Sequence, residues 1–187
     1  MQKKYKSYSD IELLSCFTER STEAEAAFSE LYQRYSGKIH AYCVKMLNDE
    51  DAAEDIFQDT FIRFYQNIDL KRNNVNVSSF LFTIARNLCY NFIRDKKQIL
   101  SIENMDFSDD FKNPAEEKEL LEMITMALDL ISVKYKEAFI LREYNDLSYE
   151  EIALLLELSV SNAKARVRRA KNKIREILEP YLNEAIS

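Results

Sequence analysis

An all-α fold of two small helical domains is predicted for this sequence, on the strength of three observations. The 187 residues include one Gly and two Pro, so the residues that form hairpins and sheet turns are nearly absent. Apolar residues recur at three- and four-residue steps over most of the chain, as in amphipathic helices. Residues 98–115 break this pattern with an acidic, Ser- and Asn-rich stretch that predicts a flexible linker. The expected domains are therefore residues 1–97 and 116–187.

The first domain is expected to begin with a short helix and two long ones. Apolar residues at helical spacing predict a short helix over residues 10–18 and a long amphipathic helix over residues 22–47. Asn48 and Asp49 are suited to cap a second long helix, which should end near Asp69. The inner stripe of that helix is Ala53, Phe57, Thr60, Phe61, Phe64 and Ile68.

A loop and one more helix complete the first domain. Residues 71–77 (KRNNVNV) have no helical period, and Asn favours turns because its side chain bonds to nearby backbone groups. Ser78 or Ser79 then caps a helix that runs to about Lys97. The inner residues of this helix are Leu81, Ile84, Ala85, Leu88, Phe92 and Ile93.

The second domain carries a helix-turn-helix pattern. Ser148 and Glu151 read as a capping box, and Leu147 with Ile152 as the hydrophobic staple that accompanies it. Ser159 can cap the helix that follows. Two short helices joined by a turn of three or four residues are typical of a helix-turn-helix, whose second helix enters the major groove of DNA. The four helices expected in this domain cover residues 116–130, 134–144, 148–156 and 160–178.

The turn between the last two helices carries Glu157 where glycine is frequent. A left-handed backbone conformation at a residue other than glycine costs about 1 kcal/mol. The sequence therefore predicts either a strained Glu157 or a turn of altered geometry.

The last helix has one apolar side and several cationic ones. Seven cations and no acid lie between Lys164 and Arg175 (KARVRRAKNKIR). Asn162 and the small Ala165 stand near the beginning of the helix, where they leave room for base edges. A groove-reading helix needs this combination, and the alternative is a solvated basic helix without a partner. The side that should face the domain core is Val160, Ala163, Val167, Ala170, Ile174 and Leu178.

The distribution of charge indicates two kinds of partner. The net charge of −6 argues by itself against a nucleic-acid binder, because phosphate binding normally requires a basic domain. The average conceals an asymmetry, since residues 49–59 and 103–117 are strongly acidic whereas residues 164–175 are strongly basic. Two surfaces of opposite sign are therefore expected.

A catalytic or metal-binding function is not expected. The single histidine, His40, lies beside apolar positions of a long helix, and the chain has no Gly-rich phosphate loop and no nucleophile with a neighbouring base. Cys16, Cys43 and Cys89 are too far apart for a metal site or a disulfide framework and read as buried thiols of a reducing compartment. With neither a signal peptide nor a long apolar run, we expect a soluble cytoplasmic protein without cofactors or metal.

Three segments in order resemble the extracytoplasmic-function (ECF) sigma factors, the smallest members of the sigma-70 family. Asp51 to Phe61 (DAAEDIFQDTF) is similar to region 2.2, Ser79 to Lys97 (SFLFTIARNLCYNFIRDKK) to regions 2.3 and 2.4, and Leu147 to Lys171 (LSYEEIALLLELSVSNAKARVRRAK) to region 4.2. Phe80 stands where the family commonly has Trp, and Asn91 where Asp is common. The resemblance implies a sigma2 domain and a sigma4 domain without a sigma3 domain between them.

The resemblance also implies three sets of site residues. Contacts with the promoter −35 element and its phosphates are expected from Arg142, Ser161, Asn162, Lys164, Ala165, Arg168, Arg169 and Lys171. Recognition and melting of the −10 element, including capture of a flipped base, are expected from Asn73, Asn74, Asn76, Arg86, Asn87, Tyr90 and Arg94. Binding to the polymerase is expected from Asp51, Glu54, Asp55, Gln58 and Asp59.

The partners that the resemblance implies are promoter DNA, core RNA polymerase and an anti-sigma factor. In the polymerase the expected contacts are the clamp coiled coil of the β′ subunit and the β flap. A conventional helix-turn-helix transcription regulator, with an N-terminal sensing or dimerisation domain, is the alternative. That alternative predicts binding to DNA without polymerase, as a dimer on paired half-sites.

Overall fold

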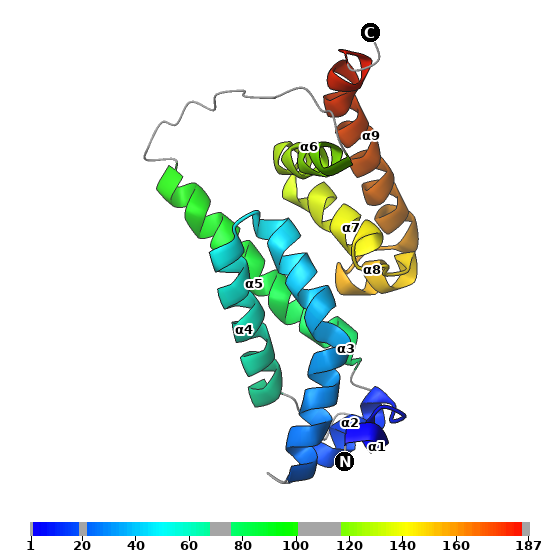
Figure 1. Ribbon diagram of the computed structural model, residues 1–187. Coiled ribbons are helices and arrows are strands. Elements are labelled where there is room, and N and C mark those ends of the chain that lie inside the picture. The colour runs from blue at the N-terminus through cyan, green and yellow to red at the C-terminus, as the bar shows by residue number, and fades with distance from the viewer. Residues whose placement is uncertain (1, 19–21, 68–75, 101–116, 185–187) are drawn as a thin grey trace. The chain divides into compact units, whose positions relative to one another are not determined.

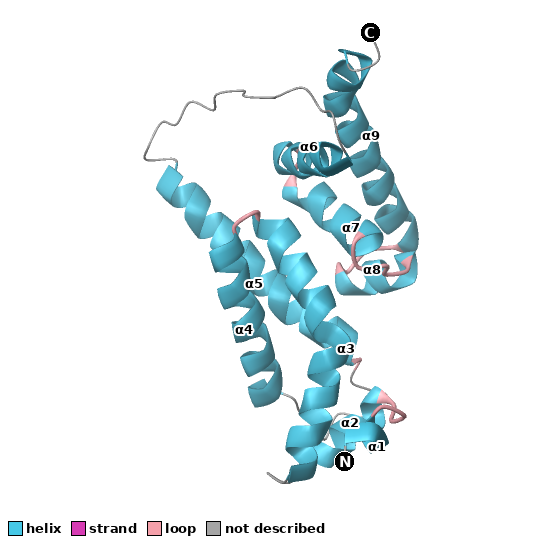
Figure 2. Cartoon of the chain, in the orientation of Figure 1, coloured by secondary structure: helices cyan, strands magenta, loops and turns pink. Residues whose placement is uncertain are grey.

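Helices form nearly all of the regular structure of the protein. No strand occurs in the part of the chain that the computed structural model describes, which confirms the all-α prediction (Figure 2). The described residues are 2–18, 22–67, 76–100 and 117–184.

The chain divides into two compact units, as expected for a protein of two helical domains. One unit contains residues 1–44 and 49–90, and the other contains residues 45–48 and 91–187. The domain boundaries expected from the sequence, 1–97, 98–115 and 116–187, stay a prediction, because residues 101–116 lie outside the described ranges.

The N-terminal half of the chain folds largely as its apolar periodicity predicts (Figure 1). The short helix is divided into an α-helix and a turn of 3₁₀ helix, and the last helix continues three residues beyond Lys97. The elements are α1 (Gln2–Tyr5), α2 (Asp10–Ser15), a 3₁₀ turn (Cys16–Thr18), α3 (Thr22–Leu47), α4 (Glu50–Asn67) and α5 (Val77–Leu100).

Local side-chain bonds determine where several of these helices begin. Ser9 and Glu12 form a capping box on α2, and the bonds from the Ser9 backbone N–H and hydroxyl lower the pKa of the Glu12 carboxyl. Asp49 caps α4 as predicted, since its Oδ1 accepts a bond of 3.2 Å from the N–H of Ala52. These short-range bonds satisfy N–H groups that have no partner inside the helix.

The prediction for the cap of α5 was wrong. Oδ1 of Asn76 accepts a bond of 2.9 Å from the N–H of Ser79, and the helix begins at Val77. Ser78 and Ser79 therefore lie inside α5. Asn is as good a cap as Ser, and the side chain that first reaches the free N–H groups decides the start of the helix.

Aromatic rings dominate the core of the first unit. The ring centroids of Tyr42 on α3 and Phe82 on α5 lie 5.6 Å apart in an edge-to-face arrangement, and both residues are fully buried. The predicted inner stripe of α4 is confirmed for its described members, and Ile68 lies outside the described residues. On α5 the prediction missed Phe82. The buried members of the α4 stripe are Ala53, Phe57, Thr60, Phe61 and Phe64.

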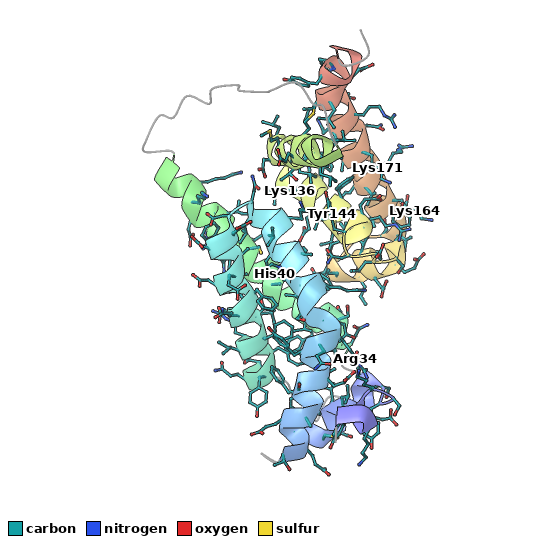
Figure 3. All side chains as sticks on the ribbon, viewed as in Figure 1. Arg34, His40, Lys136, Tyr144, Lys164 and Lys171 are labelled. Atoms are coloured by element: carbon teal, nitrogen blue, oxygen red, sulfur yellow. The ribbon has the colours of Figure 1, made fainter. Side chains whose placement is uncertain are left out.

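Arg34 attaches the N-terminal helices to α3 (Figure 3). Its guanidinium lies 2.9 Å from Asp10 and 3.0 Å from Glu30, and it also donates to the backbone carbonyl of Tyr5. The hydroxyl of Tyr35 donates to the same Asp10 carboxylate, and burial with this bond raises the pKa of Tyr35. The start of the chain is therefore held against the long helix.

The C-terminal half forms a four-helix arrangement with its own core. Lys136, although buried, donates to Asp129 and joins the second of these helices to the first. The last helix runs through Pro180 and ends at Glu184, beyond the predicted Leu178. The elements are α6 (Glu117–Leu130), α7 (Val133–Glu143), α8 (Tyr149–Leu155) and α9 (Val160–Glu184). A cluster of core residues consists of Met123, Ala127, Leu128, Ile131, Ala170, Ile174 and Leu178.

Candidate functional site

The helix-turn-helix is formed by α8, the turn after it and the first half of α9. The backbone N–H of Ser148 lies 2.8 Å from Oε2 of Glu151, and the N–H of Glu151 lies 3.2 Å from the Ser148 hydroxyl, so the predicted capping box is confirmed. Leu147 and Ile152, the predicted staple, are both buried. The Ser159 hydroxyl accepts a bond of 3.2 Å from the N–H of Asn162 and caps α9. The start of each helix is therefore specified locally.

Glu157 adopts the left-handed backbone conformation, with a φ of 54°. Of the two alternatives predicted from the sequence, the structure therefore shows the strained Glu157. The N–H of Leu158 donates to the carbonyl of Ala153 at 2.8 Å, and the N–H of Glu157 lies 3.4 Å from the carbonyl of Leu154. These two bonds form a Schellman motif, which closes the end of α8 and satisfies its last carbonyls. The turn geometry is retained, and Glu157 carries the strain.

The core side of α9 is as predicted. Val160 is half-buried, and the other five residues of the predicted side are buried. Because these residues occupy one stripe of the helix, the cations on its other faces point away from the core. The exposed or half-buried cations of this helix are Lys164, Arg166, Arg168, Arg169, Lys171, Lys173 and Arg175.

The predicted −35 contacts on α9 lie on its accessible faces. Ala165 is half-buried, and the others are exposed: Ser161, Asn162, Lys164, Arg168, Arg169 and Lys171. Two of these cations, Lys164 and Lys171, are labelled in Figure 3. Both have partners, since Lys164 lies over the ring of Tyr149 and Lys171 is paired with Glu143. Arg168 and Arg169 form no ion pair with the acids that the structure describes. Their charge is available for an anionic ligand.

Arg142 lies in the same region, at the end of α7. Its Nη1 donates to the backbone carbonyl of Leu147 at 2.9 Å, and its guanidinium carbon lies 5.0 Å from the ring centroid of Tyr149. Sequence reasoning did not select Tyr149. The signal that could have found it is its place at the first position of α8, next to the predicted capping box.

The predicted −10 residues are only partly covered by the structure. Asn73 and Asn74 lie outside the described residues, whereas Asn76 is exposed and caps α5. On α5 the guanidinium of Arg86 lies 4.8 Å from the ring centroid of Tyr90.

The other two predicted α5 contacts are exposed. Asn87 and Arg94 both lie at the surface, and Arg94 pairs with Asp95 at 3.0 Å. Since residues three or four positions apart share one face of a helix, Asn87, Tyr90 and Arg94 line one side of α5. This side presents amide, aromatic and cationic groups, the types that bind an unstacked strand.

An acidic surface covers the outward side of α4. Glu54 accepts a bond of 2.7 Å from Gln58, and one of its carboxylate oxygens lies 3.6 Å from Nε2 of His40. Asp59 pairs with Arg63 at 2.9 Å. The predicted polymerase contacts that are exposed are Asp51, Glu54, Asp55 and Gln58, and Asp59 is partly exposed.

An apolar groove of 560 Å³ adjoins this acidic surface, and the sequence did not predict it. Tyr32 is 39% exposed here, and Ile62 and Tyr65 are 54% and 42% exposed. The ring centroids of Tyr32 and Phe61 lie 4.8 Å apart across α3 and α4. The groove is lined by Glu25, Phe28, Tyr32, Phe57, Gln58, Phe61, Ile62, Tyr65 and Gln66.

None of the helices in the described ranges is both long and apolar enough to cross a membrane. Among the same residues, no group of three or more His, Cys, Asp and Glu side chains is placed to hold a metal ion.

Two family models match the chain in the order that the resemblance implies. The model of Sigma-70 region 2 matches residues 31–99, and the model of Sigma-70, region 4 matches residues 121–174. The first covers α4, α5 and most of α3, and the second covers the helix-turn-helix.

Several curated proteins are similar over most of their length. The ECF RNA polymerase sigma factor SigM of Bacillus subtilis is 28% identical over 159 residues, which are 83% of this chain and 97% of SigM. The ECF RNA polymerase sigma factor SigW of the same organism is 30% identical over 81% of this chain and 89% of SigW. The ferric citrate uptake sigma factor FecI of Escherichia coli is 30% identical over 80% of this chain and 90% of FecI.

Solved structures agree with these relatives. The sigma factor RpoE from Bartonella quintana, in complex with the anti-sigma factor NepR, has a TM-score of 0.66 and 27% identity over 81% of this chain and 96% of RpoE. CnrH, in complex with the cytosolic domain of CnrY, has a TM-score of 0.65 over 91% of this chain and 97% of CnrH, and at 21% identity it supports the fold alone. The chain belongs to the ECF RNA polymerase sigma factors.

Proposed function

We propose that this sigma factor carries out promoter selection with two chemically opposite surfaces. The observation that carries the proposal is the placement of exposed cations on α9, in one unit, and of exposed acids on α4, in the other. An overall charge of −6 is unfavourable for binding DNA alone. The acidic surface therefore binds polymerase, which brings the basic helix to the promoter.

The −35 element is bound by α9. Its first exposed residues, Ser161, Asn162 and Lys164, are nearest to base edges when the start of a recognition helix enters the major groove. Arg168 and Arg169, which pair with no acid in the described structure, supply charge for a guanine edge or a phosphate. The half-buried Ala165 leaves space for a thymine methyl group.

The −10 element is bound by α5 and the loop before it. Asn87, Tyr90 and Arg94 offer an amide, a ring and a cation along one side of the helix, which suits a melted strand. Asn76 directly precedes α5, and its Nδ2 group, which donates to none of the described residues, is proposed to donate to a base while its Oδ1 caps the helix. Asn73 and Asn74 are proposed to complete the pocket for the flipped base.

Core polymerase is bound by the acidic surface of α4 together with the adjoining groove. Gln58 belongs to both, since it is bonded to Glu54 and also lines the groove. Exposed aromatic and aliphatic residues beside acids fit a partner that offers apolar anchors and cations. We assign this combined surface to the clamp coiled coil of the β′ subunit.

The β flap is assigned to a second pocket, in the C-terminal unit. This pocket of 340 Å³ lies between α6, α7 and α9 and is lined in part by Leu130, Ile131 and Ile177. Leu130 is 67% exposed and offers an apolar contact at the edge of this pocket. Its lining also includes Lys134, Lys173 and one acid, Glu176, and this excess of cations favours a partner that carries acids.

An anti-sigma factor is a further proposed partner. The sigma factor RpoE from Bartonella quintana was solved in complex with the anti-sigma factor NepR. The same class of partner is proposed for this chain, which acts in the cytoplasm by binding and not by catalysis.

Transcription in vitro tests the proposal. The full chain is mixed with core RNA polymerase and a library of duplexes with randomised promoter regions, and transcribed templates are recovered. Templates with two conserved elements are expected. If no template is recovered and the chain alone binds paired half-sites as a dimer, the protein is instead a conventional helix-turn-helix transcription regulator.

A matched pair of variants on one helix sharpens this experiment. Arg168→Ala is expected to change the bases recovered at one −35 position, because it removes a base contact. Lys173→Ala, on the same helix but outside the predicted contacts, is expected to leave the recovered sequence unchanged. Identical recovered sequences for both variants would remove Arg168 from base recognition and leave it only a phosphate contact.

A further inference from the structure

The ring of Tyr149 is contacted by cations from two other helices. The guanidinium carbon of Arg142, on α7, lies 5.0 Å from the ring centroid, and Nζ of Lys164, on α9, lies 5.5 Å from it. A cation within about 6 Å of an aromatic ring is attracted by the negative charge of the ring face. One ring therefore joins two predicted DNA-binding cations.

Each member of this group is held by its own local structure. Tyr149 directly follows the capping residue Ser148, which determines the first turn of α8. The Arg142 guanidinium is also bonded to the carbonyl of Leu147 at 2.9 Å. Lys164 lies in the second turn of α9, whose start is capped by Ser159. The distances between the three groups are therefore set by the packing of three helices.

We propose that Tyr149 is a positioning residue for DNA binding, which holds Arg142 and Lys164 ready for the phosphate backbone. This inference rests on the proposed role of α9 in −35 recognition. Arg and Lys side chains have many rotamers and lose this freedom when they bind a phosphate. A ring that restrains both side chains beforehand lowers that loss and so raises the affinity.

Two other roles of Tyr149 predict different results. Its hydroxyl could donate to a phosphate directly, in which case Tyr149→Phe would weaken binding. Its ring could serve only to pack the half-buried start of α8, in which case its loss would weaken binding equally with and without the two cations. Tyr149→Phe keeps the ring face, whereas Tyr149→Leu keeps apolar volume without it.

The test measures the affinity of holoenzyme for one duplex recovered from the randomised library, at several salt concentrations. Tyr149→Phe is expected to bind within about twofold of the natural chain, and Tyr149→Leu about fivefold more weakly. The salt dependence of Tyr149→Leu should also be smaller, because phosphate contacts are lost. In the background Arg142→Ala/Lys164→Ala, Tyr149→Leu should have no further effect.

The proposal is overturned if Tyr149→Phe binds as weakly as Tyr149→Leu, or if Tyr149→Leu is equally harmful without the two cations.

A measurement on the natural chain, by nuclear magnetic resonance, covers the case in which Tyr149→Leu does not fold. The ε protons of Lys164 should resonate upfield of those of Lys171, which is paired with an acid and lies over no ring of the described residues. Equal shifts would contradict the ring contact. Failure of the proposed function would appear in the earlier selection experiment, because the natural holoenzyme would then recover no duplex from the library.

Discussion

Oε1 of Glu143 on α7 lies 2.8 Å from Nζ of Lys171 on α9. One of the cations expected to contact the promoter therefore already has a carboxylate partner. The side chain of Lys171 is 46% exposed and that of Glu143 is 34% exposed. An ion pair of this exposure contributes about 0.5 kcal/mol or less to stability. The pair has little effect on the fold, but it places a negative charge on the surface proposed to face DNA.

Removing this acid should strengthen DNA binding. Glu143→Gln frees Lys171 and removes a charge that repels phosphates, so we expect about threefold tighter binding of holoenzyme to promoter DNA and a steeper salt dependence. Titration of a labelled promoter duplex measures both. Glu179→Gln, an equal change of charge at the far end of α9, serves as the control and should have a smaller effect. Weaker binding by Glu143→Gln would show that the ion pair orients Lys171 for DNA.

Glycine at the turn should stabilise the helix-turn-helix. Glu157 has a φ of 54° in a Schellman motif, a conformation that glycine adopts without strain. We expect Glu157→Gly to raise the free energy of opening of α8 by about 1 kcal/mol, as measured by amide hydrogen exchange. Glu157→Ala retains the strain and should give no gain. Equal protection in both variants would mean that the left-handed conformation costs little here.

Asn76 should have separable effects on stability and on promoter melting. Asn76→Ala removes the cap of α5 and should lower the free energy of unfolding by about 1 kcal/mol, whereas Asn76→Asp keeps a capping oxygen and should be as stable as the natural chain. Asn76→Asp replaces the amide donor by an anion, so its holoenzyme should melt promoters more slowly. Thermal unfolding and permanganate reactivity of the −10 region measure the two effects. If the Asn76→Asp holoenzyme melts promoters at the normal rate, Asn76 acts only as the cap of α5 and does not contact the −10 element.

Charge reversal on α4 should weaken polymerase binding without unfolding the chain. Asp55 is exposed and Asp59 partly exposed, and reversal at the second also breaks its ion pair with Arg63. We expect Asp55→Lys and Asp59→Lys each to reduce the affinity for core polymerase about tenfold. Glu23→Lys, on the exposed start of α3, changes the net charge equally and should have little effect. Binding measured by fluorescence anisotropy, with circular dichroism for the fold, distinguishes these cases.

The apolar groove should be as important for polymerase binding as the acids. Ile62 is 54% exposed at its edge, so Ile62→Asp should leave the fold stable. Loss of an apolar anchor should reduce the affinity for core polymerase about tenfold or more. Leu154→Asp, at a residue 67% exposed on α8, introduces the same charge outside the groove and is the matched control. Equal effects of the two variants would exclude the groove as a specific contact.

Most features that depend on neighbouring residues were predicted correctly. The capping box of Ser148 and Glu151 and the cap at Ser159 join residues three positions apart, so the sequence contains both partners. The apolar stripes of α4 and α9 follow from the helical period. The cap of α5 was misassigned because Asn76, Ser78 and Ser79 are all suitable caps in isolation. The bond from the N–H of Ser79 to the side chain of Asn76 decides among them.

Features that join separate helices were not predicted. Tyr32 has the same periodicity as its buried neighbours on α3, yet it is partly exposed and lines the apolar groove together with residues of α4. The contacts of Tyr149 with Arg142 and Lys164 connect three helices. No spacing along the chain encodes such contacts, which depend on the crossing angles of packed helices.

The sequence by itself determined the all-α class, the helix-turn-helix with its basic helix, the membership in a family and the sign of each surface. Hydrophobic period, capping and charge act over a few residues, and they can be read without coordinates. Only the tertiary structure decided which cations of α9 form no ion pair with the described acids, which acid pairs with Lys171 and where the apolar groove lies. Those properties arise when side chains from different helices meet, since burial and pairing are set by packing in three dimensions.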